Sequence, residues 1–266
     1  MRYSNLHNHT VFSDGRHTPE ENVLAAIEAG MESLGFSDHS DTPCDQSYCM
    51  KTSQYDAYIA CIDELKDRYA QKLRIFTGME LDAYSDIPAQ KLDYRIASVH
   101  YILENGKCYP IDHSLPQQQE CAAEVFGGDR VAMARHYFHL LTEHVRRCRP
   151  NLVGHFDVIT KFGFMPEEDP AYRDAARQAL EQIIPLCPYI EVNTGAIARG
   201  CRDIPYPAPY LWDTLKTCGA RLVLGSDSHD KKNLCFHFEQ TVALLKQAGF
   251  DKIWAFNGTD YESRDI

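Results

Sequence analysis

The sequence lacks any apolar run that approaches the length of a membrane span, so we expect no membrane-spanning segment. It is also short of cations, because 27 Lys and Arg stand against 38 Asp and Glu, for a formal net charge of −11. A surface this acidic repels phosphate backbones at long range, so we expect no nucleic-acid partner. Hydrophobic residues make up 44% of the 266 residues, which is enough for one domain with a substantial core.

Cysteine pairs of the Cys-x-x-Cys type are also absent, although the sequence contains 10 cysteines. Residues 1–5 lead directly into a strand-like run and do not read as a signal peptide. We therefore expect reduced, scattered and mostly buried cysteines in a cytoplasmic protein.

Short apolar runs alternate with amphipathic stretches along the whole chain. The strand-like runs are 3–7, 33–36, 73–77, 94–99, 151–154, 189–192, 221–224 and 252–256. The helical stretches are 19–29, 53–71, 129–147, 170–185, 208–218 and 236–248. Thr18, Pro19 and Glu21 form a capping box that begins the first helix, and Gly30 ends it. This order predicts parallel βαβ units in a single (β/α) barrel domain over 1–266, complete or distorted, with a long irregular loop at 103–128.

Polar residues follow the strand-like runs in register. In a barrel of this type the chemistry lies at the carboxyl ends of the strands, so these side chains should share one rim. In chain order they are His7 and His9, Asp38 and His39, Glu80, His100, His155, Asn193 and Arg199, and Asp227 and His229. Taken singly, each has a simpler explanation, such as a helix cap or a solvated histidine. Together they predict one site.

Nine residues are candidate metal ligands: eight belong to this set, and the ninth is His17. They are His7, His9, His17, His39, Glu80, His100, His155, Asp227 and His229. Nine donors exceed the four to six that one metal takes, so we expect two or three metals with shared ligands. Mixed imidazole and carboxylate donors favour Zn, Mn or Fe over Ca and Mg, which prefer oxygen ligands. His17, on the turn before the first helix, is by itself more simply a loop histidine.

Several metals held together indicate hydrolysis, because a metal pair lowers the pKa of water and neutralises charge on a phosphoryl oxygen. Lys161 and Arg199 follow the fifth and sixth runs and would lie on the same rim. Either could hold phosphate oxygens, Arg199 in bidentate fashion. The alternative for both is a solvated surface cation.

At this point the pattern resembles the PHP (polymerase and histidinol phosphatase) family. The motifs that carry the resemblance are His7-x-His9, Ser13-Asp14-Gly15-x-His17, Asp38-His39, Glu80, His100, Gly154-His155 and Asp227-x-His229. They run from residue 7 to residue 229, and the full set is specific although no single element is. Within the family the chain is most similar to the monofunctional histidinol-phosphate phosphatases. Among the reasons are Ser98-Val99-His100-Tyr101 and the run 191–195, Glu-Val-Asn-Thr-Gly.

The resemblance implies a distorted (β/α)7 TIM-like barrel and a distribution of ligands. One metal would take His7, His9, Glu80 and Asp227, a second Glu80, His100 and His155, and a third His17, His39 and His229. Glu80, Asp227, His155 and Arg199 would be catalytic, while Lys161, Arg199 and Asn193 would bind substrate.

The implied reaction is hydrolysis of L-histidinol phosphate to L-histidinol and phosphate, in histidine biosynthesis. Hydroxide that bridges the metals at Glu80 would attack phosphorus, and Asp157, His155 or a metal-bound water would protonate the leaving alkoxide. The segment 102–110 departs from the family, because it lacks the Gly-Gly-Trp expected after the Ser-Val-His strand. Two alternatives remain: another phosphoesterase of the family that acts on a small phosphodiester or a nucleotide, and a non-catalytic metal-binding module.

Overall fold

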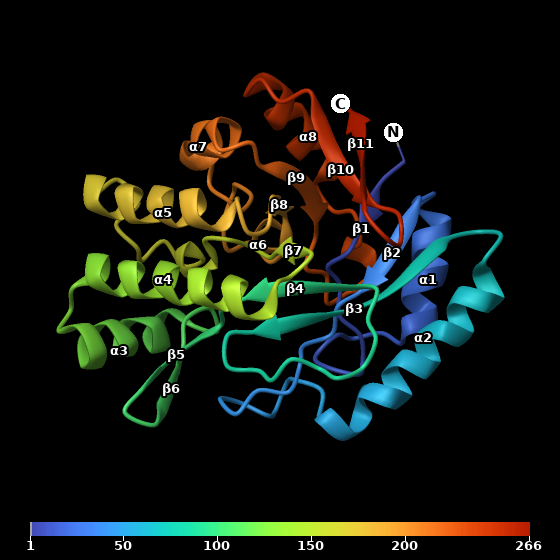
Figure 1. Ribbon diagram of the computed structural model, residues 1–266, viewed down its shortest axis with the longest axis horizontal. Helices are drawn as coiled ribbons and strands as arrows, with labels where there is room; N and C mark the ends of the chain where they lie inside the picture. The colour runs from blue at the N-terminus through green and yellow to red at the C-terminus, as the bar shows by residue number, and fades with distance from the viewer. Residues whose placement is uncertain (1) are drawn as a thin grey trace.

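The protein is an α/β fold built around one nine-stranded sheet, as the computed structural model of residues 2–266 shows (Figure 1). Its strands are β1 (Ser4–Asn5), β2 (Ser33–Phe36), β3 (Arg74–Asp82), β4 (Tyr94–Ser98), β7 (Leu152–Val153), β8 (Tyr189–Asn193), β9 (Arg221–Gly225), β10 (Lys252–Phe256) and β11 (Tyr261–Asp265), paired in that order. All neighbours are parallel except β10 and β11. The mostly parallel α/β sheet predicted from the sequence is confirmed.

The helices lie outside the strands in Figure 1. They are α1 (Pro19–Glu28), α2 (Tyr55–Tyr69), α3 (Leu115–Phe126), α4 (Arg130–Cys148), α5 (Pro170–Ile183), α6 (Gly195–Ala198), α7 (Trp212–Thr217) and α8 (Phe238–Gln247). The Thr18 side chain accepts a hydrogen bond from the Glu21 amide, and the Glu21 side chain accepts from the Thr18 amide. The capping box read from the sequence is therefore present at the start of α1. No helix described over 2–266 is long and apolar enough to cross a membrane.

The segment 103–128 is not the irregular loop that we predicted. It contains most of a hairpin, β5 (Tyr101–Glu104) and β6 (Lys107–Pro110), and then α3. Asn105 and Gly106 take the positive φ values of 51° and 79° that a two-residue hairpin turn requires. Ser114 then caps α3 by accepting a hydrogen bond from the Gln117 amide.

The end of the sheet confirms the predicted run 252–256 but differs from the strand number that the family resemblance implies. The run 252–256 is β10, which pairs with β9 in parallel, so the sheet has eight parallel strands where the family resemblance implies seven. The last strand, β11, was not predicted at all. Its sequence, Tyr-Glu-Ser-Arg-Asp, is polar, and all five of its residues are exposed or half-buried at the edge of the sheet.

Two apolar layers hold the strands in place. The larger lies between the sheet and the helices, and the smaller is formed by side chains of the strands themselves, including Phe76, Tyr94 and Phe256. Tyr94 is fully buried, and its hydroxyl donates hydrogen bonds to the carbonyls of Leu6 and Phe36. A Cβ at Gly35 or Gly78 would lie within 2.4 Å of Tyr94 side-chain atoms, so these two positions must be glycine for the tyrosine ring to fit.

The segments that follow β1 and β9 lie side by side. An isolated parallel bridge joins Asn8 to Ser228, and the His9 amide donates a 2.8 Å hydrogen bond to the Ser228 carbonyl. Residues from the two ends of the chain thereby become neighbours at the carboxyl ends of the strands.

One disulfide bond corrects the expectation that the cysteines are all reduced. Cys44, in the loop after β2, is bonded to Cys108 in β6, 64 positions later in the sequence. The other eight cysteines are free, and of these Cys201 is exposed. The two cysteines are far apart in sequence, so their spacing did not predict the bond.

Candidate active site

Eight of the nine predicted ligands gather at one rim of the sheet. Their donor atoms fall into four overlapping groups, each with its atoms within 4.8 Å of one another. The groups are His9, Asp14, His39 and His229; His7, Glu80 and His155; His7, His9 and Asp227; and His39, Glu80 and His100. Shared members join the four groups into one cluster.

Glu80 lies at the centre of this cluster. It belongs to β3, which extends beyond the predicted run to Asp82, and it is 1% exposed. Its Oε2 faces the Nε2 atoms of His7 and His9 at 3.3 and 3.6 Å and the Nδ1 atom of His39 at 2.9 Å. Its Oε1 faces the Nε2 atoms of His100 and His155 at 3.4 and 2.9 Å. The two oxygens of one carboxylate therefore serve two different sets of imidazoles.

Asp227 closes the opposite side of the cluster. Its Oδ1 lies 3.1 Å from His9 Nε2 and 3.5 Å from His7 Nε2. Its backbone has a φ of 45°, a strained left-handed conformation for a residue other than glycine. Strain of this kind is held by the surrounding structure and often marks a functional position.

The structure does not bring His17 into the cluster. Its Nε2 lies 3.3 Å from Asp230 Oδ1, and its Nδ1 lies 3.6 Å from Glu21. Asp14 occupies the place beside His39 and His229 instead, with its Oδ1 3.7 and 3.2 Å from their Nε2 atoms. We did not predict Asp14 as a ligand, although it stands in the same turn.

The turn that carries Asp14 packs tightly against the first histidine pair. A Cβ at Gly15 would come within 2.4 Å of the His9 backbone, so glycine is required there. Buried Asp38 accepts hydrogen bonds from the amides of Thr10 and Ser13, which fixes the start of the turn. Asp38 is therefore a support of the turn and not a member of the cluster.

Two carboxylates outside the cluster orient its histidines. Glu191 is fully buried; its Oε1 accepts from His7 Nδ1 at 2.8 Å, and its Oε2 accepts from the His155 amide at 2.7 Å. Asp82 accepts from the His100 amide at 2.9 Å. A carboxylate bonded to a ring nitrogen, as Glu191 is to His7 Nδ1, sets the tautomer and direction of a ligating imidazole. A signal for Glu191 was present in the sequence, because a charged residue inside a buried strand needs a partner.

Several polar atoms of the cluster are buried without any hydrogen bond. They include both ring nitrogens of His9, His7 Nε2, Glu80 Oε2, and the Nδ1 atoms of His100 and His155. Buried polar atoms are normally paired, and imidazole nitrogens with carboxylate oxygens are the donors that divalent transition metals take. The residues present therefore fit a group of bound metal ions.

The charge states of two members of the cluster, Glu80 and His9, match this description. Burial would raise the pKa of Glu80, but His7, His39 and His100 outweigh it and hold that pKa well below the ordinary value. Burial, reinforced by His39 and His229, lowers the pKa of His9 to about 3. Glu80 is thus ionised and His9 neutral at physiological pH, which are the forms that bind metals.

Arg199 and Lys161 are held beside the cluster and are not solvated surface cations. Arg199, at the end of α6, donates from Nη2 to Asp227 Oδ2 at 2.6 Å and from Nη1 to the Asp227 carbonyl at 3.0 Å. Lys161 Nζ donates to the Asp112 carbonyl at 2.6 Å, and the side chain of Lys161 is 14% exposed. Asn193 is fully buried and accepts from the Gly195 amide, so its carbonyl oxygen holds the turn before α6.

Asp157, two residues after His155, is fully buried. Its Oδ2 accepts a 2.9 Å hydrogen bond from the Ala208 amide, while its Oδ1 has no partner. Burial raises the pKa of Asp157 to about 7. A carboxyl group that holds its proton near neutral pH is suited to donate it.

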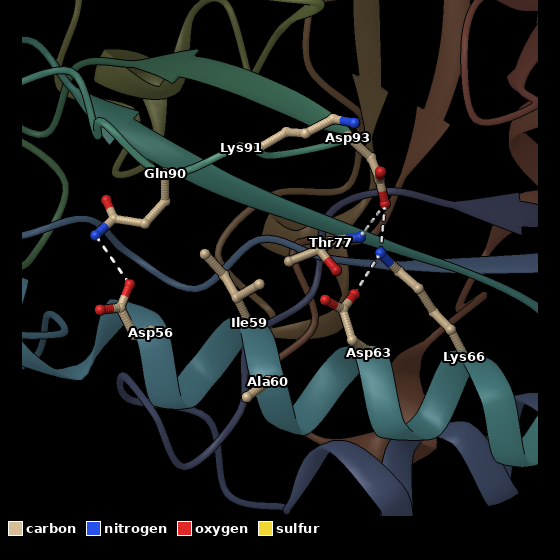
Figure 2. A pocket seen from close by; sticks show the side chains of 9 residues that line it. All are labelled: Asp56, Ile59, Ala60, Asp63, Lys66, Thr77, Gln90, Lys91 and Asp93. Atoms are coloured by element: carbon tan, nitrogen blue, oxygen red, sulfur yellow. Dashed lines mark hydrogen bonds and ion pairs between the residues drawn. The ribbon is translucent and has the colours of Figure 1, made fainter.

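A separate cavity of about 510 Å³ lies between α2 and the approach to β4 (Figure 2). The Lys66 Nζ atom lies 2.9 Å from Asp63 and 2.8 Å from Asp93, and Asp56 accepts a hydrogen bond from the Gln90 side chain. None of the cluster's residues lines this cavity. Lys66 and Asp93 thereby join α2 to the segment just before β4.

Comparisons with known proteins identify a family and several similar sequences. The model of the PHP domain matches residues 5–195. A Deinococcus radiodurans protein named "Probable histidinol-phosphatase" is 30% identical over 242 residues, which cover 87% of this chain and 88% of that protein. The histidinol-phosphatase of Lactococcus lactis is 25% identical, with 97% and 96% covered.

A crystal structure of the Lactococcus lactis histidinol phosphate phosphatase, complexed with Zn, L-histidinol and phosphate, has the same fold. Its TM-score is 0.76 at 22% identity, over 98% of this chain and 99% of that one. The family match covers the strands that carry most of the clustered histidines, and the 30% relative spans nearly the whole chain. The chain belongs to the PHP domain family.

Proposed function

We propose that this chain is a metal-dependent phosphomonoesterase that hydrolyses L-histidinol phosphate to L-histidinol and phosphate. The observation that carries the proposal is the buried cluster around Glu80, with unpaired imidazole nitrogens on both sides and Arg199 at its edge. The names of the relatives support the choice of substrate, since each matches most of the chain.

The cluster has enough donor atoms to bind two or three divalent ions. Glu80 would be shared, because one oxygen faces His7, His9 and His39 and the other faces His100 and His155. When bound, such ions make water a nucleophile at neutral pH and neutralise charge on phosphoryl oxygens. The mixed nitrogen and oxygen donors favour Zn, Mn or Fe, and a Lactococcus structure with the same fold contains Zn.

The residues around the cluster supply the rest of the chemistry. Arg199 is fixed by two hydrogen bonds to Asp227, so its guanidinium is already oriented when the phosphate arrives. Its planar fork matches two phosphate oxygens, and Lys161 adds one point charge. Asp157, whose pKa is raised to about 7 by burial, and His155 are the candidate side chains for the group that would protonate the leaving alkoxide.

The test is phosphate release by metal-reconstituted protein from a panel of esters. The panel holds L-histidinol phosphate, two nucleoside monophosphates and bis(p-nitrophenyl) phosphate. We expect the highest kcat/KM for L-histidinol phosphate. Faster hydrolysis of a nucleotide or of the diester would assign the chain to another phosphoesterase of the family, and no release from any ester with metals bound would make it a metal-binding module. A cytoplasmic location and a role in histidine biosynthesis stay predictions.

A further inference from the structure

A partly exposed tyrosine stands directly beside the cluster on the loop that follows β2. The ring of Tyr48 meets the ring of His39 edge to face, with centroids 4.8 Å apart. It also stacks on Tyr101, with centroids 6.2 Å apart and an interplanar angle of 28°. Tyr101 is buried, so the two stacked phenol rings form one aromatic wall whose partly exposed member, Tyr48, meets His39.

Several carboxylates lie close to this aromatic wall. The carboxylates of Asp82 and Asp112 lie close enough to raise the pKa of Tyr48, after the larger effect of burial. Asp45 and the same two carboxylates act in the same way on Tyr101, again after burial. Lys161 is bonded to Asp112, and His100 Nδ1 lies 3.4 Å from Asp82, so two of these three carboxylates have a basic partner and Asp45 adds a third negative charge. The wall therefore faces a region of net negative charge.

A cation lies on the other side of His9 and His39 from Tyr48. The ring of His39 stacks on that of His9, His9 Nε2 lies 3.1 Å from Asp227 Oδ1, and Arg199 Nη2 is bonded to the same carboxylate. A phosphate ester bound between the two sides would direct its phosphate to the arginine and its leaving group to the aromatic wall. Phenol rings and carboxylates together attract a flat cationic group and repel an anionic one.

The wall is fastened by the disulfide bond. Cys44 stands four residues before Tyr48 on the loop, and Cys108 stands in β6, whose partner strand β5 begins at Tyr101. The bond thus joins the two segments that carry the two rings. Without it, the loop that carries Tyr48 would have one connection fewer to the hairpin.

We propose that Tyr48, positioned by the Cys44–Cys108 disulfide, is a specificity-determining residue that selects phosphate esters with a cationic, aromatic leaving group. This inference rests on the proposed function and deepens it, since L-histidinol carries both an imidazole ring and an ammonium group. It assigns the choice of leaving group to the loop after β2 and the hairpin β5–β6, where the chain departs from the family's Gly-Gly-Trp pattern.

The test compares Tyr48→Leu and Tyr48→Phe in metal-loaded protein. Its two substrates are L-histidinol phosphate and glycerol 2-phosphate, whose leaving group is neutral and not aromatic. Loss of a cation–ring contact should raise the KM of Tyr48→Leu for L-histidinol phosphate about tenfold, with KM for glycerol 2-phosphate, kcat and metal content nearly unchanged. Tyr48→Phe keeps the ring and should restore the KM.

A second variant tests the fastening. Cys44→Ser should raise KM for L-histidinol phosphate in the same direction as Tyr48→Leu, while Cys218→Ser, a change at a free cysteine on the far end of α7, should leave it unchanged. Equal KM changes for both substrates in Tyr48→Leu, or a loss of metal, would overturn the proposal, because Tyr48 would then only pack against His39.

The proposed function and this inference can fail separately. If wild-type protein does not hydrolyse L-histidinol phosphate, the proposed function is wrong, and calorimetry with L-histidinol on metal-loaded protein still tests the wall. Weaker binding by Tyr48→Leu than by Tyr48→Phe supports the inference. Equal binding by both variants, or no binding by wild type, overturns it.

Discussion

Glu191→Gln changes one buried oxygen to an amide nitrogen and should disable His7 as a metal ligand. The Glu191 carboxylate only accepts hydrogen bonds, so it requires a proton on His7 Nδ1 and leaves Nε2 free to face Glu80. A glutamine must still accept from the His155 amide, which turns its NH2 group toward His7. His7 then accepts at Nδ1 and carries its proton on Nε2, where it blocks the metal.

The size of this effect follows from losses measured when such orienting groups are removed. They cost about 10–100-fold in metal affinity or activity, which is about 1.4–2.7 kcal/mol. Competition with a colorimetric chelator measures the affinity, and phosphate release from L-histidinol phosphate measures the activity. Glu28→Gln, at an exposed position of α1, is the matched control and should behave as wild type. Wild-type affinity and turnover in Glu191→Gln would refute the reasoning about the tautomer.

Three further changes test other parts of the site and the fold. Glu80→Gln should lose the shared metals and nearly all activity while the chain still folds; metals retained with most of the activity would contradict the bridging role. His17→Ala should lower metal content by about one ion per chain if its loop ring turns to the group of His9, Asp14, His39 and His229 on binding; if Asp14→Asn does so and His17→Ala does not, Asp14 is the ligand. Burial lowers the pKa of His144 to about 4, and its neutral form donates to a backbone carbonyl at 2.8 Å. A group with a lowered pKa adds stability above pH 6.5 that is lost as the pH falls, so wild type should lose about 2 kcal/mol more than His144→Gln between pH 7 and pH 5. His139→Gln, at an exposed position of the same helix, should track wild type in urea unfolding, and equal losses in all three proteins would show that His144 is not the cause.

The parts of the fold that the sequence predicted are those with local signals. The capping box at Thr18 has a defined chemistry over four residues, and the structure contains it. The apolar runs are short and buried, so their alternation with helices indicates a parallel sheet before any contact is known. The gathering of histidines at one rim follows from that topology, because parallel strands end on the same side.

The structural features that differ from prediction depend mostly on contacts between segments that are distant in sequence. The Gly and Pro residues of the segment 103–128 favour a loop, yet Asn105–Gly106 within it is a strong hairpin signal. Strand β11 has no apolar run, since it lies at an edge. The Cys44–Cys108 bond joins residues 64 apart, and nothing in their spacing indicates it. Asp14 enters the cluster only because Gly15 lets its turn pack on His9.

The most direct test of the central claim is phosphate release from L-histidinol phosphate, measured as a function of metal ions bound per chain. Protein stripped with a chelator is titrated with Zn or Mn, and elemental analysis follows each step. We predict no release from stripped protein and a rise that reaches its plateau at about two or three ions per chain. Full activity in metal-free protein, or a cluster that takes up less than about one ion per chain, would contradict the account.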